Sequence, residues 1–65
     1  MTPKFKPFDI VKHRKGGVYM IYCTPLQCRI EKDNVPAYLY TEEKGPRKLW
    51  VRPQTEMEDG RFTLV

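Results

Sequence analysis

The chain has 65 residues, 40% hydrophobic and 31% charged, and its 12 basic and 8 acidic side chains give a formal net charge of +4. This size allows one small domain and leaves little room for a deep substrate pocket. No apolar stretch approaches the roughly 18 residues of a membrane-spanning helix, and the N-terminus lacks the apolar segment of a signal peptide. We therefore expect a single domain in the cytoplasm, without a membrane association, with residues 1–7 as a candidate flexible arm.

Short runs rich in β-branched and aromatic residues, separated by turn residues, predict strands rather than helices. Six prolines and four glycines would interrupt any long helix. In chain order, the predicted strands are residues 9–13, 18–23, 35–41, 47–52 and 61–65, with turns at 15–17, 32–34 and 59–60 and one helical turn at 54–59. The segment 24–35 carries the weakest pattern, and residues 27–31 within it are a candidate for further pairing.

Five short strands in a chain of this length predict an all-β fold, specifically a small SH3-like, partly open five-stranded barrel. Closure of this kind removes exposed strand edges and lets one small core serve every strand. Alternation along the strands separates Leu39, Leu49 and Val51 from Tyr38, Tyr40 and Trp50. We place the aliphatic set inside. The predicted core is Ile10, Val11, Val18, Met20, Ile21, Leu39, Leu49, Val51, Phe62 and Leu64.

The outward aromatic rings, with basic residues beside them, form the candidate binding surface. Tyrosine, tryptophan and arginine dominate the hot spots of protein interfaces, and the same side chains can stack on bases and hold phosphates. The candidate partner-binding residues are Tyr38, Tyr40, Arg47, Lys48, Trp50 and Arg52. Two structural alternatives stay open: the rings cover the barrel wall with their hydroxyls in water, or Arg52 pins the acidic segment 56–59 through charge-assisted bonds.

The basic residues gather in the N-terminal half of the chain. Residues 1–29 carry six basic residues and one acidic residue, whereas residues 30–65 carry six basic and seven acidic residues. A basic half can meet an acidic protein or nucleic acid, although +4 is also an ordinary charge for a small domain. The candidate phosphate contacts are Lys4, Lys6, Lys12, Arg14 and Lys15.

No constellation of residues predicts catalysis, a cofactor or a metal. His13 is the only histidine, and no motif places a nucleophile and an orienting carboxylate beside it. Cys23 and Cys28 have a spacing that zinc sites use, but His13 is the only histidine that could join them. We expect no enzyme activity, no cofactor, no metal and two free, mostly buried thiols, with a disulfide as the open alternative.

Several segments resemble known patterns. FKPFDIV at residues 5–11 is similar to the F-x-x-G-D-x-V opening strand of small SH3-like domains, with Phe8 in place of glycine. HRKGGVY at 13–19, LWVRP at 49–53, Met57 and DGRF at 59–62 resemble a family of short bacterial and phage SH3-like domains of unknown function. The resemblance spans residues 8–62, except that 24–35 does not match in detail. It implies an SH3-like fold, a prokaryotic or phage source and, for a phage protein, the host cytoplasm; it implies no activity.

The sequence therefore predicts a non-enzymatic protein-binding module, with a phage or prophage accessory protein that modulates a host protein as its concrete form. The alternative is a small barrel that binds nucleic acid through the basic N-terminal half. Homodimerisation through exposed aromatic side chains is a separate prediction.

Overall fold

The computed structural model describes residues 2–65, which form six strands, one 3-10 turn and one short helix. The turn η1 (Lys32–Asn34) precedes β4, and the helix α1 (Gln54–Met57) connects β5 to β6. The strands are β1 (Ile10–His13), β2 (Val18–Cys23), β3 (Arg29–Ile30), β4 (Val35–Glu42), β5 (Leu49–Pro53) and β6 (Phe62–Leu64).

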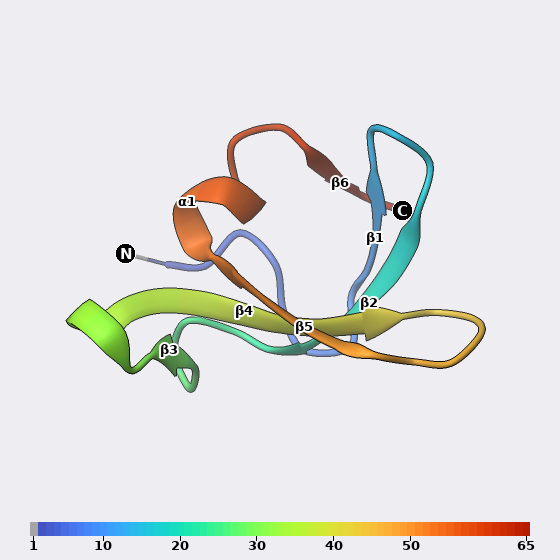
Figure 1. The fold of residues 1–65 in the computed structure, drawn as a ribbon. Coiled ribbons are helices and arrows are strands. Elements are labelled where there is room, and N and C mark those ends of the chain that lie inside the picture. The colour runs from blue at the N-terminus through green and yellow to red at the C-terminus, as the bar shows by residue number, and fades with distance from the viewer. Residues whose placement is uncertain (1) are drawn as a thin grey trace.

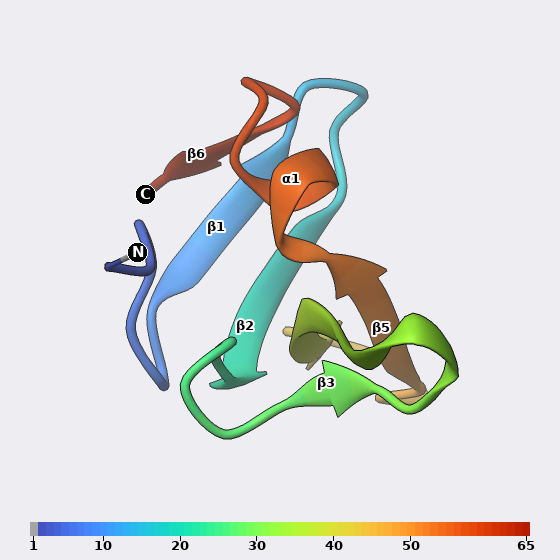
Figure 2. The same ribbon diagram turned by 90° about the vertical axis from the view of Figure 1, so that its left-hand side faces the viewer.

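All six strands belong to one antiparallel sheet with the order β3-β4-β2-β1-β6, and β5 pairs with β4. Residues 39–41 pair with both β2 and β5, so β5 lies along the edge of β4 opposite β2. In Figure 1, β4 and β5 run across the view and the strands β1, β2 and β6 rise above them, so the sheet is bent. Within residues 2–65, β5 and β6 do not pair, and α1 lies between them (Figure 2). This confirms a small all-β fold with a partly open sheet. The sixth strand, β3, falls within residues 27–31, the candidate for further pairing.

Two adjacent glycines make the β1–β2 turn possible for different reasons. Gly16 has a φ of +115°, a backbone conformation that residues with a Cβ rarely adopt. Gly17 lies against the ring of Tyr19, and a Cβ at this position would lie 2.6 Å from the Tyr19 hydroxyl oxygen. The turn therefore positions an aromatic ring as well as reversing the chain.

The core lies on the concave side of the bent sheet and is mainly aromatic. Tyr19, Tyr40 and Phe62 meet edge to face, with ring centroids 5.4 to 6.0 Å apart. Phe5 is only 1% exposed, so the predicted arm is anchored in the core rather than extending from it. The buried cluster consists of Phe5, Val11, Ile21, Tyr38, Tyr40, Met57 and Phe62.

The predicted faces of β4 and β5 are wrong. Tyr38 and Tyr40 are buried, whereas Leu49 and Val51 are 62% and 52% exposed. Of the other predicted core residues, Leu64 is exposed, and Ile10, Val18, Met20 and Leu39 are only partly buried. The physical reason is that both faces of these strands are apolar enough to be buried, and the tyrosine rings fill the concave side better. Their hydroxyls find polar partners at its margin.

Candidate interaction surface

The structure separates the six residues that we predicted to bind a partner. Tyr38 and Tyr40 belong to the core, and Arg52 is partly buried. The other three, Arg47, Lys48 and Trp50, are exposed at or near the β4–β5 loop. The Trp50 indole N–H donates a 2.7 Å hydrogen bond to Glu42, the last residue of β4.

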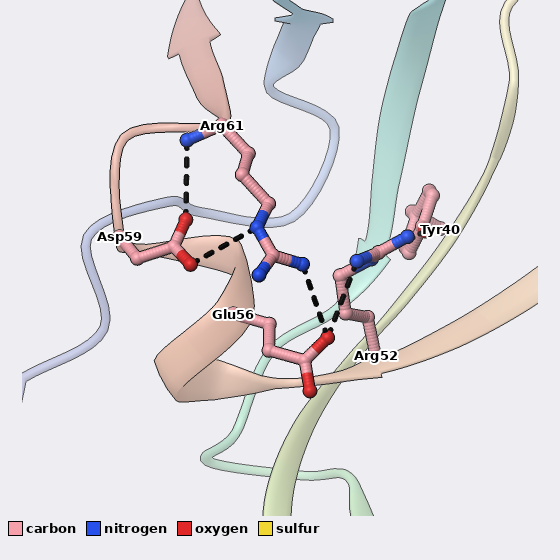
Figure 3. Close-up of polar contacts among 5 residues, drawn as sticks. All are labelled: Tyr40, Arg52, Glu56, Asp59 and Arg61. Atoms are coloured by element: carbon pink, nitrogen blue, oxygen red, sulfur yellow. Dashed lines mark hydrogen bonds and ion pairs between the residues drawn. The ribbon is translucent and has the colours of Figure 1, made fainter.

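Arg52 connects β5 to the core and to α1 (Figure 3). Its Nε donates to the Tyr40 hydroxyl over 3.2 Å, and its Nη1 lies 3.3 Å from Glu56 Oε1. The guanidinium also lies over the Phe62 ring, 5.7 Å from the centroid. The hydrogen bond with Tyr40 raises the pKa of Arg52; burial opposes this, and the nearby carboxylates add to it. The alternative in which Arg52 pins the acidic segment 56–59 is thus confirmed.

Arg61 completes this network from the other end of the helical turn (Figure 3). Its Nη1 lies 3.2 Å from the same Glu56 oxygen, and its Nε lies 3.0 Å from Asp59 Oδ2. The Arg61 backbone N–H also donates to Asp59. Two guanidinium groups therefore share one carboxylate of α1, which fixes the helix between β5 and β6.

Glu58 makes a second network that holds the N-terminal segment. Its Oε2 accepts hydrogen bonds from the Lys4 backbone N–H at 2.9 Å, the Tyr38 hydroxyl at 2.5 Å and the Gln54 amide at 3.1 Å. Burial alone would raise the pKa of Glu58, but these hydrogen bonds outweigh it and hold the pKa below its ordinary value. Burial and the bond to Glu58 raise the pKa of Tyr38 to about 12.

The contacts of His13, Cys23 and Cys28 are those of residues that support the fold. The His13 ring packs edge to face on Phe62 with centroids 4.9 Å apart, and its Nδ1 accepts a hydrogen bond from the Lys15 backbone N–H. Desolvation, followed by the charges of Arg52 and other nearby cations, lowers the pKa of His13 and favours the neutral ring.

Both cysteines are free thiols, and burial followed by the proximity of Cys23 raises the pKa of Cys28. Within residues 2–65, no three His, Cys, Asp or Glu side chains cluster as metal ligands would.

The side of the sheet opposite the core carries apolar side chains from the four strands β1, β2, β4 and β5. Residues directly opposite each other on neighbouring strands share a face, and the register sets Ile10 opposite Met20, Met20 opposite Thr41 and Thr41 opposite Leu49. A second row sets Cys23 opposite Leu39 and Leu39 opposite Val51. We call this surface the outer face and define it by Ile10, Met20, Leu39, Thr41, Leu49 and Val51.

Thr41 is an unusual residue at the centre of the outer face. It is only 5% exposed, and its hydroxyl has no hydrogen-bond partner among the described residues. Buried hydroxyls are normally hydrogen-bonded, because burying one without a partner costs about 1–3 kcal/mol. The outer face therefore buries an unpartnered polar atom at a position opposite Met20 on one side and Leu49 on the other.

Most of the acidic side chains accept hydrogen bonds within the domain, whereas most of the basic side chains form no ion pair. Among residues 2–65 only Arg52 and Arg61 form ion pairs with carboxylates, so the other ten of the 12 basic side chains have no such partner. The carboxylates that accept hydrogen bonds within the domain are Asp9, Glu42, Glu56, Glu58 and Asp59. With Arg52, Arg61 and their partners Glu56 and Asp59 set aside, ten basic and six acidic side chains remain, so the net charge stays at +4.

The candidate phosphate contacts are all exposed but do not form one group. Lys4 and Lys6 lie in the N-terminal segment, Lys12 on β1, and Arg14 and Lys15 in the β1–β2 turn. That turn is close to the β4–β5 loop, since the backbone N–H of Glu43 donates to the Val18 carbonyl over 3.1 Å. Figure 1 shows both connections on the same side of the molecule.

A hollow of about 360 Å³ separates the β1–β2 turn from the β4–β5 loop. Its lining includes Tyr19, Lys44 and the two acidic residues Glu42 and Glu43. The carboxylates disfavour a phosphate inside the hollow, although Glu42 is engaged by Trp50. Phosphate groups would have to bind around its rim.

The fold and these surfaces define the chain as a small β domain. Hydrogen bonds and ion pairs surround its core, and no other element of the described chain covers its apolar outer face. Comparisons with family models, curated proteins and solved structures give no match for this chain. The resemblance to the SH3-like bacterial and phage family therefore stays a prediction. Within residues 2–65 no helix is long and apolar enough to span a bilayer.

Sequence reasoning missed the outer face because it assigned Met20, Leu39, Leu49 and Val51 to the core. The alternation of Leu49 and Val51 with Trp50 and Arg52 in β5 correctly showed that the two apolar residues share a face. Alternation shows which residues share a face, but it does not show which face is buried.

Proposed function

We propose that the protein is a non-enzymatic binding module that docks on another protein through its outer face. The observation that carries this proposal is the exposure of Leu49 and Val51, which end two neighbouring rows of opposed side chains on the outer face. Exposed apolar side chains that gather on one face, rather than singly, are typical of interaction sites. The narrower role, a phage or prophage accessory protein that modulates a host protein, rests on the family resemblance alone.

The charge distribution supports an acidic partner. Ten basic side chains lack a carboxylate partner within the described part of the chain, and Lys12 shares the outer-face side of β1 with Ile10. Interfaces commonly combine an apolar centre with a charged rim, and complementary charge speeds association. Of the originally predicted binding residues, Arg47, Lys48 and Trp50 remain accessible, while Tyr38, Tyr40 and Arg52 support the fold.

The proposal is tested by capture from a bacterial lysate treated with nuclease. Tagged wild-type protein is compared with Leu49→Glu on the outer face and with Leu26→Glu, a matched control at a leucine that is 76% exposed and lies outside that face. We expect the wild type and Leu26→Glu to retain one stoichiometric protein, and Leu49→Glu to retain at least tenfold less. Equal capture by both variants, after thermal unfolding has shown both to be folded, would contradict the proposal.

Nucleic acid is the second candidate function, and one observation favours it. The β1–β2 turn and the β4–β5 loop bring Arg14 and Lys15 to the same side of the molecule as Lys44, Arg47 and Lys48, all exposed. Binding that depends on phosphate contacts weakens steeply with salt. Titration of a fluorescent single-stranded oligonucleotide at two salt concentrations separates the functions. Submicromolar affinity that persists in Leu49→Glu and is lost in Arg14→Ala/Lys15→Ala would establish nucleic-acid binding.

A further inference from the structure

β5 is an edge strand whose outward backbone groups can be identified from the register. The N–H groups of Ala37 and Glu43 in and after β4 donate toward Cys28 and Val18, on the β3 and β2 side. Backbone groups alternate in direction along a strand, so Tyr38 and Tyr40 direct theirs toward β5. Their opposite residues are Arg52 and Trp50, which must direct their own groups back toward β4.

It follows that Leu49 and Val51 direct their N–H and C=O groups away from β4. Throughout residues 2–65, no other strand pairs with this edge of β5. Leu49 and Val51 are also the β5 residues of the outer face, and both side chains are more than half exposed. The same short segment thus offers unpaired backbone groups in the plane of the sheet and apolar side chains on one face of it.

The edge is only partly protected against pairing. Natural proteins block exposed edges with proline, lysine, bulges or covering segments. Here Pro53 removes one outward N–H at the end of β5, and Lys48 precedes its start. Between them Leu49, Trp50 and Val51 form three consecutive exposed apolar residues, which is unusual outside a binding site.

We infer that β5 receives an extended segment of the partner protein as an additional strand, with alternate apolar side chains that continue the outer face. Main-chain hydrogen bonds to Leu49 and Val51 would supply part of the affinity, as in other complexes formed by strand addition. Acidic residues flanking that segment would meet the side chains of Arg47 and Lys48, which form no ion pair in the described chain. This inference rests on the proposed protein-binding function and specifies how the partner docks.

A second copy of the chain is a poorer occupant of the same edge. An antiparallel pairing that sets Leu49 opposite Val51 of the second copy also sets Lys48 opposite Arg52. Like charges directly opposite each other destabilise a sheet, and each copy has a formal net charge of +4. An extended segment with acidic flanks can pair with the outward backbone groups of β5 and carries the charge opposite to that of the domain.

The test begins with selection from a displayed library of random peptides, with the intact domain as bait. The enriched peptide is synthesised, and amide hydrogen exchange of the domain is measured by NMR with and without it. We expect alternating apolar residues with acidic flanks in the peptide, and at least tenfold slower exchange of the Leu49 and Val51 amides in the complex. Absence of any enriched peptide would overturn the inference.

A pair of variants tests the backbone contribution separately. Val51→Pro removes an outward N–H without removing a hydrogen bond to β4, a position at which edge strands tolerate proline. Val51→Ala is the control, because it shortens the side chain and keeps the N–H group. We expect Val51→Pro to bind the selected peptide about tenfold more weakly than Val51→Ala does. If Val51→Pro does not fold, the exchange rates of the wild type decide the question.

The remaining outcomes distinguish failure of the docking mode from failure of the proposed function. A peptide that is lost in Leu49→Glu but leaves the Leu49 and Val51 amides unprotected would overturn strand addition and leave the protein-binding function standing. A domain that selects no peptide and binds only the oligonucleotide would overturn both. A concentration-dependent doubling of mass by light scattering, with the same amides protected, would assign the edge to a second copy instead.

Discussion

The two faces of β4 and β5 differ in how completely their polar groups are hydrogen-bonded and their apolar side chains buried. On the inner face, the Tyr38 hydroxyl donates to Glu58 and the Tyr40 hydroxyl accepts from Arg52, so that polar groups surround a packed aromatic core. On the outer face, Thr41 has an unsatisfied hydroxyl, and apolar side chains lie open to solvent. The difference indicates that the inner face maintains the fold and that the outer face is available for binding.

The largest effect is expected from the centre of the inner face. Phe62→Ala removes a fully buried ring that contacts Tyr19, Tyr40 and His13. Truncation of a buried phenylalanine costs about 3–5 kcal/mol, which is comparable to the whole stability of a small domain. We expect largely unfolded protein by circular dichroism. A cooperative unfolding transition near that of the wild type would show that the inner face is not the core.

The Glu58 network gives the next largest effect and depends on pH. Because the folded-state pKa of Glu58 lies below its ordinary value of 4.5, its contribution is present above that pH and is lost as the pH falls through the folded pKa. We expect Glu58→Gln to lower the free energy of unfolding by about 1–3 kcal/mol at neutral pH. Denaturant unfolding from pH 7 to pH 3 should then show a flatter acid dependence in the variant; identical slopes would refute the role of Glu58.

Tyr38 should govern the alkaline side of the stability profile. Its pKa of about 12 in the folded state exceeds the ordinary value of 10.0. The folded protein therefore favours the neutral hydroxyl, and stability falls as the pH rises through this interval. Tyr38→Phe should cost about 1 kcal/mol at neutral pH and reduce the alkaline loss. The comparison is made by denaturant unfolding at pH 8 and above; an equal loss in both proteins would assign it elsewhere.

A smaller effect is expected where the β1–β2 turn meets the core. In Gly17→Ala the new methyl group would collide with the Tyr19 ring, and we expect a loss of about 1 kcal/mol. The cause can be isolated with a double-mutant cycle, because the cost should largely disappear in a Tyr19→Ala background. Additive effects would locate the strain in the backbone of the turn instead.

The sequence predicted the local structure well, because local signals determine it. The strand at residues 18–23 has the predicted bounds, and Gly16 and Gly17 lie in the predicted turn. The helix at residues 54–57 lies within the helical turn predicted at 54–59. Alternating apolar and aromatic residues identify a strand whichever face is buried. The turn depends on glycine, whose conformational freedom is a property of the residue itself.

The sequence could not show the features that depend on how the strands pack against one another. Phe5 enters the core although it lies outside every strand, and a register shift between Ile21 and Cys23 changes which residues of β2 share a face. The orientation of Tyr38 and Tyr40 depends on partners distant in the sequence, Glu58 and Arg52. Tyr38 and Tyr40 of the candidate partner surface were consequently expected to be exposed and are buried, whereas Arg47, Lys48 and Trp50 are accessible.

The most direct test measures folding and binding in the same variant, Leu49→Glu. If the outer face serves binding and not stability, the free energy of unfolding should stay within about 0.5 kcal/mol of the wild-type value. Capture of the protein partner should at the same time fall at least tenfold, while Leu26→Glu behaves as the wild type in both measurements. An unfolded Leu49→Glu variant, or a folded one that captures the partner normally, would contradict the division of the sheet into a structural inner face and a binding outer face.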